Sequence, residues 1–204
     1  MANSQVVHVI DDDVAVRQSL AFLLSTAGLA VRVHESAVAF LGTLPDAQDG
    51  CIVTDIRMPE MDGLELQRQL RIQKVGLPVI VITGHGDVAL AVEAMKAGAV
   101  DFIEKPFDDE TLLASIRSAL SRHAREGQRD ARIAEVRSRL KLLSEREREV
   151  LDGLVAGKPN KIIAYDLGIS ARTVEVYRAN VMTKMQAGSL SELVRMVLLD
   201  GGPL

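Results

Sequence analysis

The stretch Val6-Val7-His8-Val9-Ile10-Asp11-Asp12-Asp13 decides the fold of this chain, because a short apolar run ends there in acidic residues. Later strand-like runs also lead into polar residues, namely Cys51–Thr54 into Asp55, Val79–Ile82 into Thr83, and Asp101–Glu104 into Lys105. Runs of this length, separated by amphipathic helical segments, are typical of buried parallel strands. The carboxyl ends of such strands meet at one edge of an open α/β sheet. The sequence therefore predicts that these polar side chains gather in one crevice.

Alternation of strands and helices continues to about residue 124. We expect strands near 5–10, 29–34, 51–55, 78–83 and 101–104. The segment after the last strand carries an apolar stripe at helical spacing, made of Leu112, Leu113, Ile116, Ala119 and Leu120. Alternation of this kind predicts an α/β domain with a doubly wound parallel sheet.

The composition changes after this domain. Residues 122–141 are rich in charge and poor in apolar side chains, which predicts a largely helical linker. Farther on, Ser144-x-x-Glu147 is a capping box, and a short helix near 160–167 is followed by a helix that Ser170 can cap. Two short helices joined in this way predict a helix-turn-helix. We therefore expect the α/β domain at 1–124, a linker at 125–142 and an all-α helix-turn-helix domain at 143–204.

The net charge of −4 conceals an uneven distribution along the 204 residues. Residues 1–121 carry 9 Lys and Arg against 17 Asp and Glu, a net of −8, and residues 122–204 carry 15 against 11, a net of +4. An acidic part joined to a basic part predicts two domains with different partners, of which the basic one suits nucleic acid. The opposite charges would also favour a state in which the acidic domain packs on or restrains the basic one.

The expected compartment is the cytoplasm. No uncharged stretch approaches the length of a membrane span, so we expect no membrane partner. The start, Met1-Ala2-Asn3-Ser4, lacks the basic region of a signal peptide. The single cysteine, Cys51, fits a reducing compartment and lies in an expected buried strand.

Three carboxylates and one ammonium in a crevice can hold a hard cation and a phosphoryl group. A carboxylate can attack a phosphoryl group to give an acyl phosphate, and a divalent metal with a cation screens the opposing negative charges. Mg²⁺ is the expected cofactor, with Asp12 and Asp55 as ligands and Asp11 holding a metal-bound water. We expect Lys105 to hold one phosphoryl oxygen and Thr83 to bond another.

Over residues 5–120 these positions resemble bacterial response-regulator receiver domains, and the stretch Asp55-Ile-Arg-Met-Pro-Glu-Met-Asp-Gly63 resembles their phosphoacceptor loop. The resemblance implies a sheet in the flavodoxin-like order 2-1-3-4-5 and phosphorylation of Asp55 by a sensor histidine kinase. It also implies that the Arg57 carbonyl joins the metal shell, that Thr83 and Phe102 move as a coupled switch, and that Lys105-Pro106 is cis.

In the helix-turn-helix, the second helix enters the major groove and its outward residues read bases. An inner face of Val174, Tyr177, Val181 and Met185 leaves Glu175, Val176 and Ala179 on the outer face. Glu175 suits cytosine N4, and Val176 suits a thymine methyl group. The side chains suited to phosphates are Lys161, Arg172, Thr173, Arg178 and Lys184.

Residues 143–200 resemble the LuxR/GerE type of DNA-binding domain. The matching stretches are Leu143-Ser-Glu-Arg-Glu-Arg-Glu-Val-Leu151, Gly157-x-x-Asn160-Lys161-x-Ile163-Ala164 and Ser170-x-Arg172-Thr173-Val174. Tyr177 departs from the pattern, which commonly has His there. A receiver joined to this domain resembles the NarL/FixJ family, and within it the nitrogen-fixation regulators, which implies an oxygen-responsive sensor kinase.

These features predict a transcription activator, not an enzyme. Phosphorylated on Asp55, it would form a homodimer through Val88, Val92 and Lys96, bind double-stranded promoter DNA and engage RNA polymerase. One alternative is a phospho-binding adaptor that does not bind DNA. Another is a haloacid-dehalogenase-type phosphohydrolase, because Asp11-x-Asp13 follows the first strand, although those enzymes carry Thr or Val where this chain has Ala15.

Overall fold

The computed structural model describes residues 5–44, 49–84 and 88–201. The chain divides into two compact units, residues 1–125 and residues 126–204. Each unit has hydrophobic clusters of its own, so the two are described separately.

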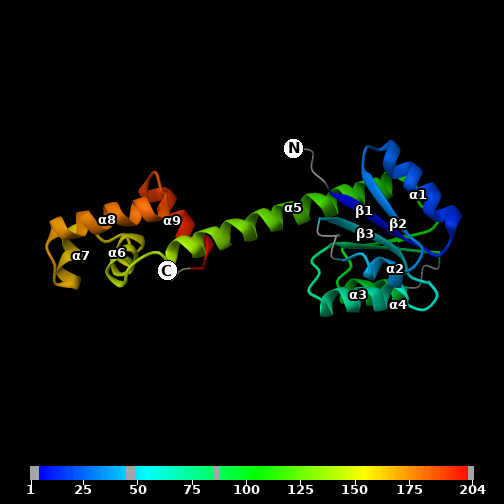
Figure 1. Ribbon diagram of the computed structural model, residues 1–204, viewed down its shortest axis with the longest axis horizontal. Helices are drawn as coiled ribbons and strands as arrows, with labels where there is room; N and C mark the ends of the chain where they lie inside the picture. The colour runs from blue at the N-terminus through cyan, green and yellow to red at the C-terminus, as the bar shows by residue number, and fades with distance from the viewer. Residues whose placement is uncertain (1–4, 45–48, 85–87, 202–204) are drawn as a thin grey trace. The chain divides into compact units, whose positions relative to one another are not determined.

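The first unit is built on a parallel sheet (Figure 1). Its strands are β1 (Val6–Ile10), β2 (Ala30–His34), β3 (Gly50–Asp55), β4 (Val79–Thr83) and β5 (Asp101–Glu104). They lie in the order β2-β1-β3-β4-β5, which confirms the order implied by the receiver resemblance. The inner strands β3 and β4 are buried along their whole length except at Asp55, as their apolar sequences require.

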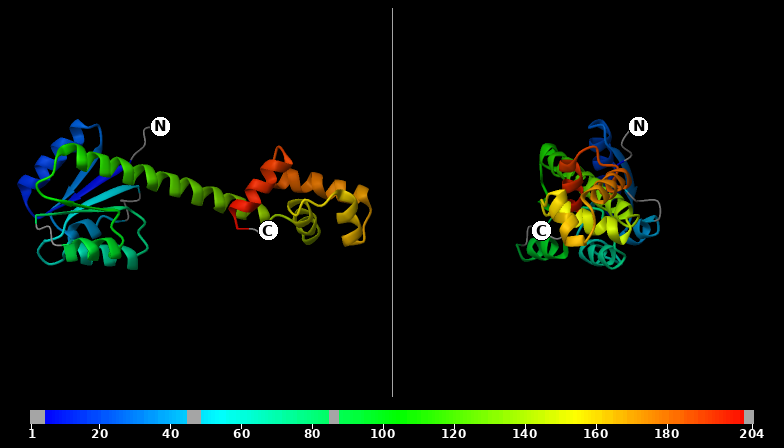
Figure 2. Two further views of the ribbon diagram at one scale, coloured as in Figure 1. Left: turned by 180° about the vertical axis from the view of Figure 1, so that it is seen from behind. Right: turned by 90° about the vertical axis from the view of Figure 1, so that its left-hand side faces the viewer.

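Helices cover both faces of the sheet (Figure 2). The helices of this unit are α1 (Val14–Thr26), α2 (Ala37–Leu41), α3 (Gly63–Ile72), α4 (Val88–Ala97) and the first part of α5 (Asp109–Leu140). One hydrophobic cluster joins the sheet to α1 and α5, and the other joins it to α2, α3 and α4. These two layers leave the carboxyl edge of the strands as the place where polar side chains can meet.

Strand register sets which residues meet at that edge. Ile10 pairs with Thr54, and Asp55 pairs with Ile82. The residues that follow these pairs are Asp11 and Thr83, so both lie beside Asp55 at the same edge. The topology alone therefore brings together side chains that are far apart in the sequence.

The second unit is all helical and has a single hydrophobic cluster in its described part, residues 126–201. Its helices are α6 (Glu145–Val155), α7 (Asn160–Leu167), α8 (Ala171–Met185) and α9 (Leu190–Leu199). Serines with extended backbone cap α6, α8 and α9, and the capping box at Ser144 and Glu147 is present. Gly168 ends α7 in the left-handed conformation, which produces the turn between α7 and α8.

The end of α5 belongs to the core of the second unit. The helix runs unbroken to Leu140, in agreement with the expected helical linker. Val136 is only 2% exposed and packs in the same cluster as the helix-turn-helix. Arg139 donates a hydrogen bond to the carbonyl of Met185, and Arg148 donates one to the carbonyl of Leu140. The last turns of α5 are thus part of the folded unit, although the sequence placed Val136 in the linker.

Across the ranges that the structure describes, no helix combines the length and the apolar character needed to span a membrane.

A buried histidine pair lies at the β1–β2 edge of the first unit. His8 Nδ1 and His34 Nε2 are 3.0 Å apart and share a hydrogen bond, and both rings pack edge-on against Phe40. Burial, with added repulsion from His34 and Arg32, lowers the pKa of His8 to about 4, and burial also lowers the pKa of His34. The pair is therefore neutral in the folded protein near pH 7.

This pair makes stability depend on pH. Between the unfolded value of 6.5 and the folded pKa of about 4, the unfolded chain binds more protons at His8, so the free energy of unfolding falls as the pH falls. We expect His8→Gln to reduce the loss of stability between pH 7 and pH 4 by on the order of 2–3 kcal/mol. Urea unfolding followed by circular dichroism at both pH values measures this loss. Equal losses in variant and wild type would contradict the assignment.

Candidate functional site

One ammonium group joins two carboxylates at the carboxyl edge of the sheet. Lys105 Nζ lies 2.8 Å from Asp55 Oδ1 and 3.2 Å from Asp11 Oδ2. Lys105 follows β5, Asp11 follows β1 and Asp55 is the last residue of β3. The Lys105–Pro106 peptide bond after β5 is cis, as the receiver resemblance implied. The structure therefore brings together three of the side chains expected in the crevice.

The loop after β3 holds Asp55 from its other side. The backbone N–H of Arg57 donates to Asp55 Oδ2 at 2.7 Å, so each carboxylate oxygen of Asp55 accepts one hydrogen bond. The loop closes where Gly63, the first residue of α3, donates to the carbonyl of Ile56. A methyl group on Gly63 would lie 2.4 Å from the carbonyl oxygen of Asp55, which is too close for any side chain. Only glycine allows α3 to start this near the carboxylate.

The charges of the crevice are only partly balanced. Burial raises the pKa of Asp11, in spite of the hydrogen bond from the Asp13 N–H and the nearby Lys105. Burial acts to lower the pKa of Lys105, but the hydrogen bond to Asp55 and the charges of both carboxylates together raise it above its ordinary value. Lys105 is therefore a permanent cation, and the buried Asp11 carboxylate would be further stabilised by more positive charge.

The donor set suits a hard divalent cation such as Mg²⁺, because Asp11, Asp12 and Asp55 offer carboxylate oxygens and Arg57 offers a backbone carbonyl. The incompletely compensated charge of Asp11 fits such an ion as well. The side chain of Asp12 is exposed, whereas Asp11 and Asp55 both face Lys105. Within the described ranges, no group of three or more His, Cys, Asp or Glu side chains is already arranged around a metal position.

The two expected switch residues lie on neighbouring strands. Thr83 is buried at the end of β4, one residue beyond the partner of Asp55. Phe102 in β5 pairs with Val81 and is partly buried against the cluster that includes α3 and α4. Their positions connect the crevice to the α4 side of the sheet.

The surface of α4 carries the residues expected at the dimer interface. Val92 is 46% exposed and Lys96 is exposed, whereas the side chain of Val88 lies outside the described part of the chain. Met95, which the sequence did not single out, is 48% exposed beside them. The surface of α4 thus carries two exposed apolar side chains, Val92 and Met95.

The second helix of the helix-turn-helix, α8, presents the expected outer face to solvent. Val174, Val181 and Met185 are buried, while the exposed residues of α8 include Arg172, Glu175, Val176 and Ala179. Val176 is 56% exposed although it is β-branched and apolar. Lys161 at the start of α7 is also exposed, and Arg178 is half-buried.

Two of the expected phosphate contacts have partners within the fold. The Lys184 ammonium lies 2.6 Å from Oε2 of the buried Glu147, and this bond lowers the pKa of Glu147. The Thr173 hydroxyl shares a hydrogen bond with Ser170 at the helix N-cap. These side chains therefore help to hold α8 in place, a role the sequence did not indicate.

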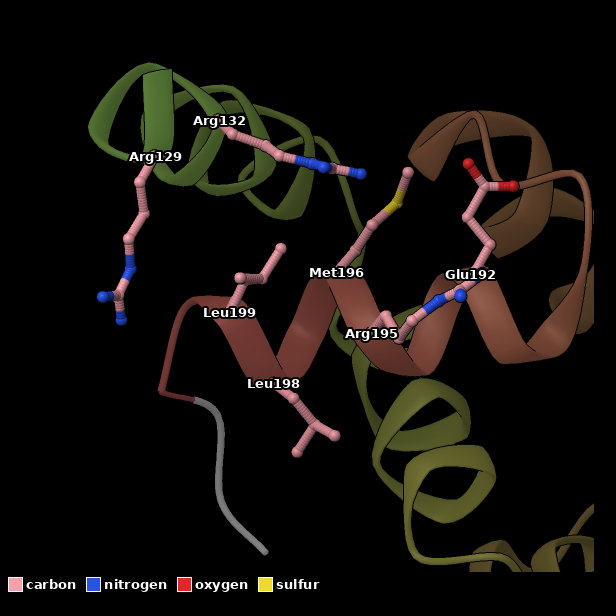
Figure 3. A pocket seen from close by; sticks show the side chains of 7 residues that line it. All are labelled: Arg129, Arg132, Glu192, Arg195, Met196, Leu198 and Leu199. Atoms are coloured by element: carbon pink, nitrogen blue, oxygen red, sulfur yellow. The ribbon is translucent and has the colours of Figure 1, made fainter. Parts of the chain in front are cut away.

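A groove of about 540 Å³ lies between the second part of α5 and α9 (Figure 3). Arg129 and Arg132 line it from α5, and Arg132 extends toward Met196 of α9. The other residues that line it are Glu192, Arg195, Leu198 and Leu199. The sequence did not predict this cluster of arginines, because its members come from segments far apart in the chain.

Comparisons with known proteins agree with this architecture. Residues 7–117 match the response regulator receiver domain family, and residues 141–197 match the LuxR family of bacterial regulatory proteins. The transcriptional regulatory protein FixJ of Azorhizobium caulinodans is 61% identical over 98% of this chain and 95% of its own length. The FixJ protein of Rhizobium meliloti is 59% identical over 97% of each chain.

Two solved structures cover almost the whole chain. Full-length FixJ from B. japonicum shares 52% identity with a TM-score of 0.63, and 97% of each chain is covered. The response regulator StyR shares 41% identity with a TM-score of 0.84, and covers 95% of this chain and 98% of its own.

The contact at Gly63 gives a test of how the carboxylate is positioned. We expect Gly63→Ala to displace the Asp55 loop, lower the free energy of unfolding by about 2 kcal/mol or more and slow any reaction at Asp55. Gly76→Ala is the control, because an added methyl group there meets nothing within 4 Å. Urea unfolding and the rate of labelling by acetyl phosphate measure both effects. If the two variants behaved alike, the close approach of α3 would not matter.

Proposed function

Because this chain belongs to the NarL/FixJ family of response regulators, we propose that it is a phosphorylation-dependent activator of transcription, phosphorylated on Asp55 by a sensor histidine kinase. The observation that carries this proposal is the contact of Lys105 Nζ with both Asp55 and Asp11, residues 50 and 94 positions away in the sequence. Such an arrangement has a clear use in phosphoryl transfer and little use in stabilising the fold, since buried ion pairs contribute weakly to stability.

Asp55 is the nucleophile of the proposed reaction. One of its carboxylate oxygens attacks phosphorus, the bond from phosphorus to the histidine nitrogen of the kinase breaks, and an acyl phosphate remains on Asp55. Lys105, kept protonated by its neighbours, then holds a phosphoryl oxygen in place of an oxygen of Asp55. Mg²⁺ bound by Asp11, Asp12, Asp55 and the carbonyl of Arg57 would screen the negative charges that otherwise oppose the transfer.

The proposed switch uses the residues between the crevice and α4. Thr83 bonds the phosphoryl group and moves toward Asp55, and Phe102 moves inward after it. The partly buried state of Phe102 supports this step, because the ring can still gain burial. The change reaches α4, where Val88, Val92 and Lys96 form the homodimer interface, and the exposed Met95 fits the same surface.

The dimer then binds double-stranded promoter DNA in the bacterial cytoplasm. Arg172, Lys161 and Arg178 contact phosphates, Thr173 and Lys184 support them, and the exposed face of α8 reads bases through Glu175, Val176 and Ala179. Once bound, the protein engages RNA polymerase. The family branch supports nitrogen-fixation genes as targets and an oxygen-responsive kinase as partner.

The acceptor is tested by Asp55→Asn with Asp62→Asn as its control. Asp62 caps α3 in the same loop, and asparagine caps helices as well as aspartate does. With acetyl phosphate and Mg²⁺, we expect Asp62→Asn to gain one phosphate and dimerise, and Asp55→Asn to remain an unmodified monomer. Intact-protein mass spectrometry and light scattering measure the two properties.

Dimerisation and DNA binding by Asp55→Asn in the presence of the phosphodonor would rule the mechanism out. Phosphate transfer that is lost in Asp11→Asn but kept in Asp55→Asn would instead favour the phosphohydrolase alternative, in which the first acidic loop carries the nucleophile.

The reading face is tested with phosphorylated full-length protein on two duplexes, one selected by the wild type from a random library and one scrambled. We expect Arg172→Gln to weaken binding to both and to reduce the salt slope by about 1 per protomer, because it removes a phosphate contact. We expect Val176→Ala to weaken binding about fivefold on the selected duplex only. Fluorescence anisotropy at several salt concentrations measures both.

Arg146→Gln is the matched control for these variants, because Arg146 is an exposed arginine of α6 that pairs with Glu149. It should bind like the wild type. A salt slope near zero for the wild-type protein itself would favour the adaptor alternative.

A further inference from the structure

Arg17, in the first turn of α1, reaches back to the acidic loop that the phosphoacceptor site uses. Its Nη1 donates one hydrogen bond to the carbonyl of Asp11 at 2.7 Å and a second to the carbonyl of Asp12 at 2.9 Å. A single guanidinium nitrogen thus binds two consecutive peptide groups. The two residues it holds are the acidic pair that the metal site requires.

Helix stability does not explain an arginine at this position. The start of a helix carries partial positive charge, so a cation in the first turn is electrostatically unfavourable. The helix is already capped, because the Asp13 side chain accepts from the N–H of Ala15 at 2.7 Å. Within the described part of the chain, the Arg17 guanidinium has no ion-pair partner, and its recorded side-chain hydrogen bonds go to the two loop carbonyls. The position is therefore better explained by what the side chain does to the loop.

By binding the loop backbone, Arg17 acts on the direction of the Asp11 and Asp12 carboxylates. A peptide group is planar, so fixing the carbonyls of Asp11 and Asp12 fixes the backbone from which both side chains project. On the opposite side of the loop, the N–H of Asp13 donates to Asp11 Oδ1 at 2.9 Å. Asp11 is therefore held at its backbone by Arg17 and at its carboxylate by Asp13 and Lys105. Asp12 has an exposed side chain, so the bond from Arg17 to its carbonyl is its main restraint in the described structure.

We propose that Arg17 is a positioning residue of the phosphoacceptor site, which holds the Asp11–Asp12 backbone so that both carboxylates are ready for a divalent cation. This inference rests on the proposed function. Residues that orient metal ligands through hydrogen bonds typically change metal affinity by 10- to 100-fold when they are replaced. Arg17 touches neither the phosphoryl group nor the metal in this assignment, and acts through the loop alone.

If Arg17 is lost, the missing charge and the missing hydrogen bonds should change the affinity for Mg²⁺ in opposite directions. Removing a cation bonded to the backbone of the acidic loop should strengthen the binding of Mg²⁺ if only Coulomb attraction matters. Releasing the loop should weaken that binding, because the ligands must then be ordered when the ion binds. The sign of the change in affinity therefore separates the two effects.

The test is isothermal titration of the unphosphorylated full-length protein with MgCl₂, for the wild type, Arg17→Met, Arg17→Lys and Arg71→Met. Methionine keeps the apolar stem and removes the donors, and lysine restores a cationic donor. Arg71 lies exposed at the end of α3 and serves as the control for a lost positive charge. We expect the Kd for Mg²⁺ to rise about tenfold in Arg17→Met, to return most of the way in Arg17→Lys, and to change less than twofold in Arg71→Met.

Amide hydrogen exchange supplies a second readout that does not depend on the metal. The N–H of Asp13 should exchange faster in Arg17→Met, because Arg17 no longer holds the loop backbone that carries both this N–H and its acceptor on Asp11, while amides in β3 and β4 keep their protection. An unchanged or lower Kd for Mg²⁺ in folded Arg17→Met would overturn the assignment. If that variant does not fold, the same criterion applies to Arg17→Gln. A wild-type protein that fails to bind Mg²⁺ would instead count against the proposed function itself.

Discussion

The candidate site of the first unit depends on one ammonium group that lies between two carboxylates at the end of a parallel sheet. Lys105 contacts Asp55 and Asp11 because three strands end side by side, with loops short enough to keep the side chains in the crevice. A buried carboxylate is costly without positive charge near it. The raised pKa of Asp11 shows that Lys105 does not remove that cost completely. Additional positive charge would therefore be favourable at the place where a phosphoryl group and its cation would bind.

Strand ends were the part of the site that the sequence could predict. A residue directly after a buried strand has its place fixed by topology, which is why Asp11, Asp55 and Lys105 were found together. Side chains that turn away from their own element were not predictable in this way. The bond from Lys184 to Glu147 joins positions 37 residues apart, and the reach of Arg17 back to the loop depends on its rotamer. Hydrophobic periodicity carries no information on the Lys184–Glu147 bond or on the direction of the Arg17 side chain.

In the second unit too, the sequence pattern predicted helices, but it did not predict all of their packing. The expected caps at Ser144 and Ser170 precede α6 and α8, and α7 spans the short helix expected near 160–167. The contribution of α5 to the core of the second unit was harder to predict, because the apolar positions in the second part of this helix are sparse and widely spaced among charged residues. Val136 nevertheless fills the core of the unit. A segment that resembles a linker by composition can therefore contribute to the core of its neighbour.

The close approach of Gly63 to the Asp55 carbonyl limits which residues can occupy position 63. Gly63 lets the start of α3 approach the Asp55 carbonyl, because its Cα carries only hydrogen on the side where any other residue would carry Cβ. Every other residue at position 63 would add at least a Cβ atom at this place, so none can replace glycine without moving the backbone. The geometry of the Asp55 loop thus depends on a residue without a functional group, and a search restricted to reactive side chains would miss it.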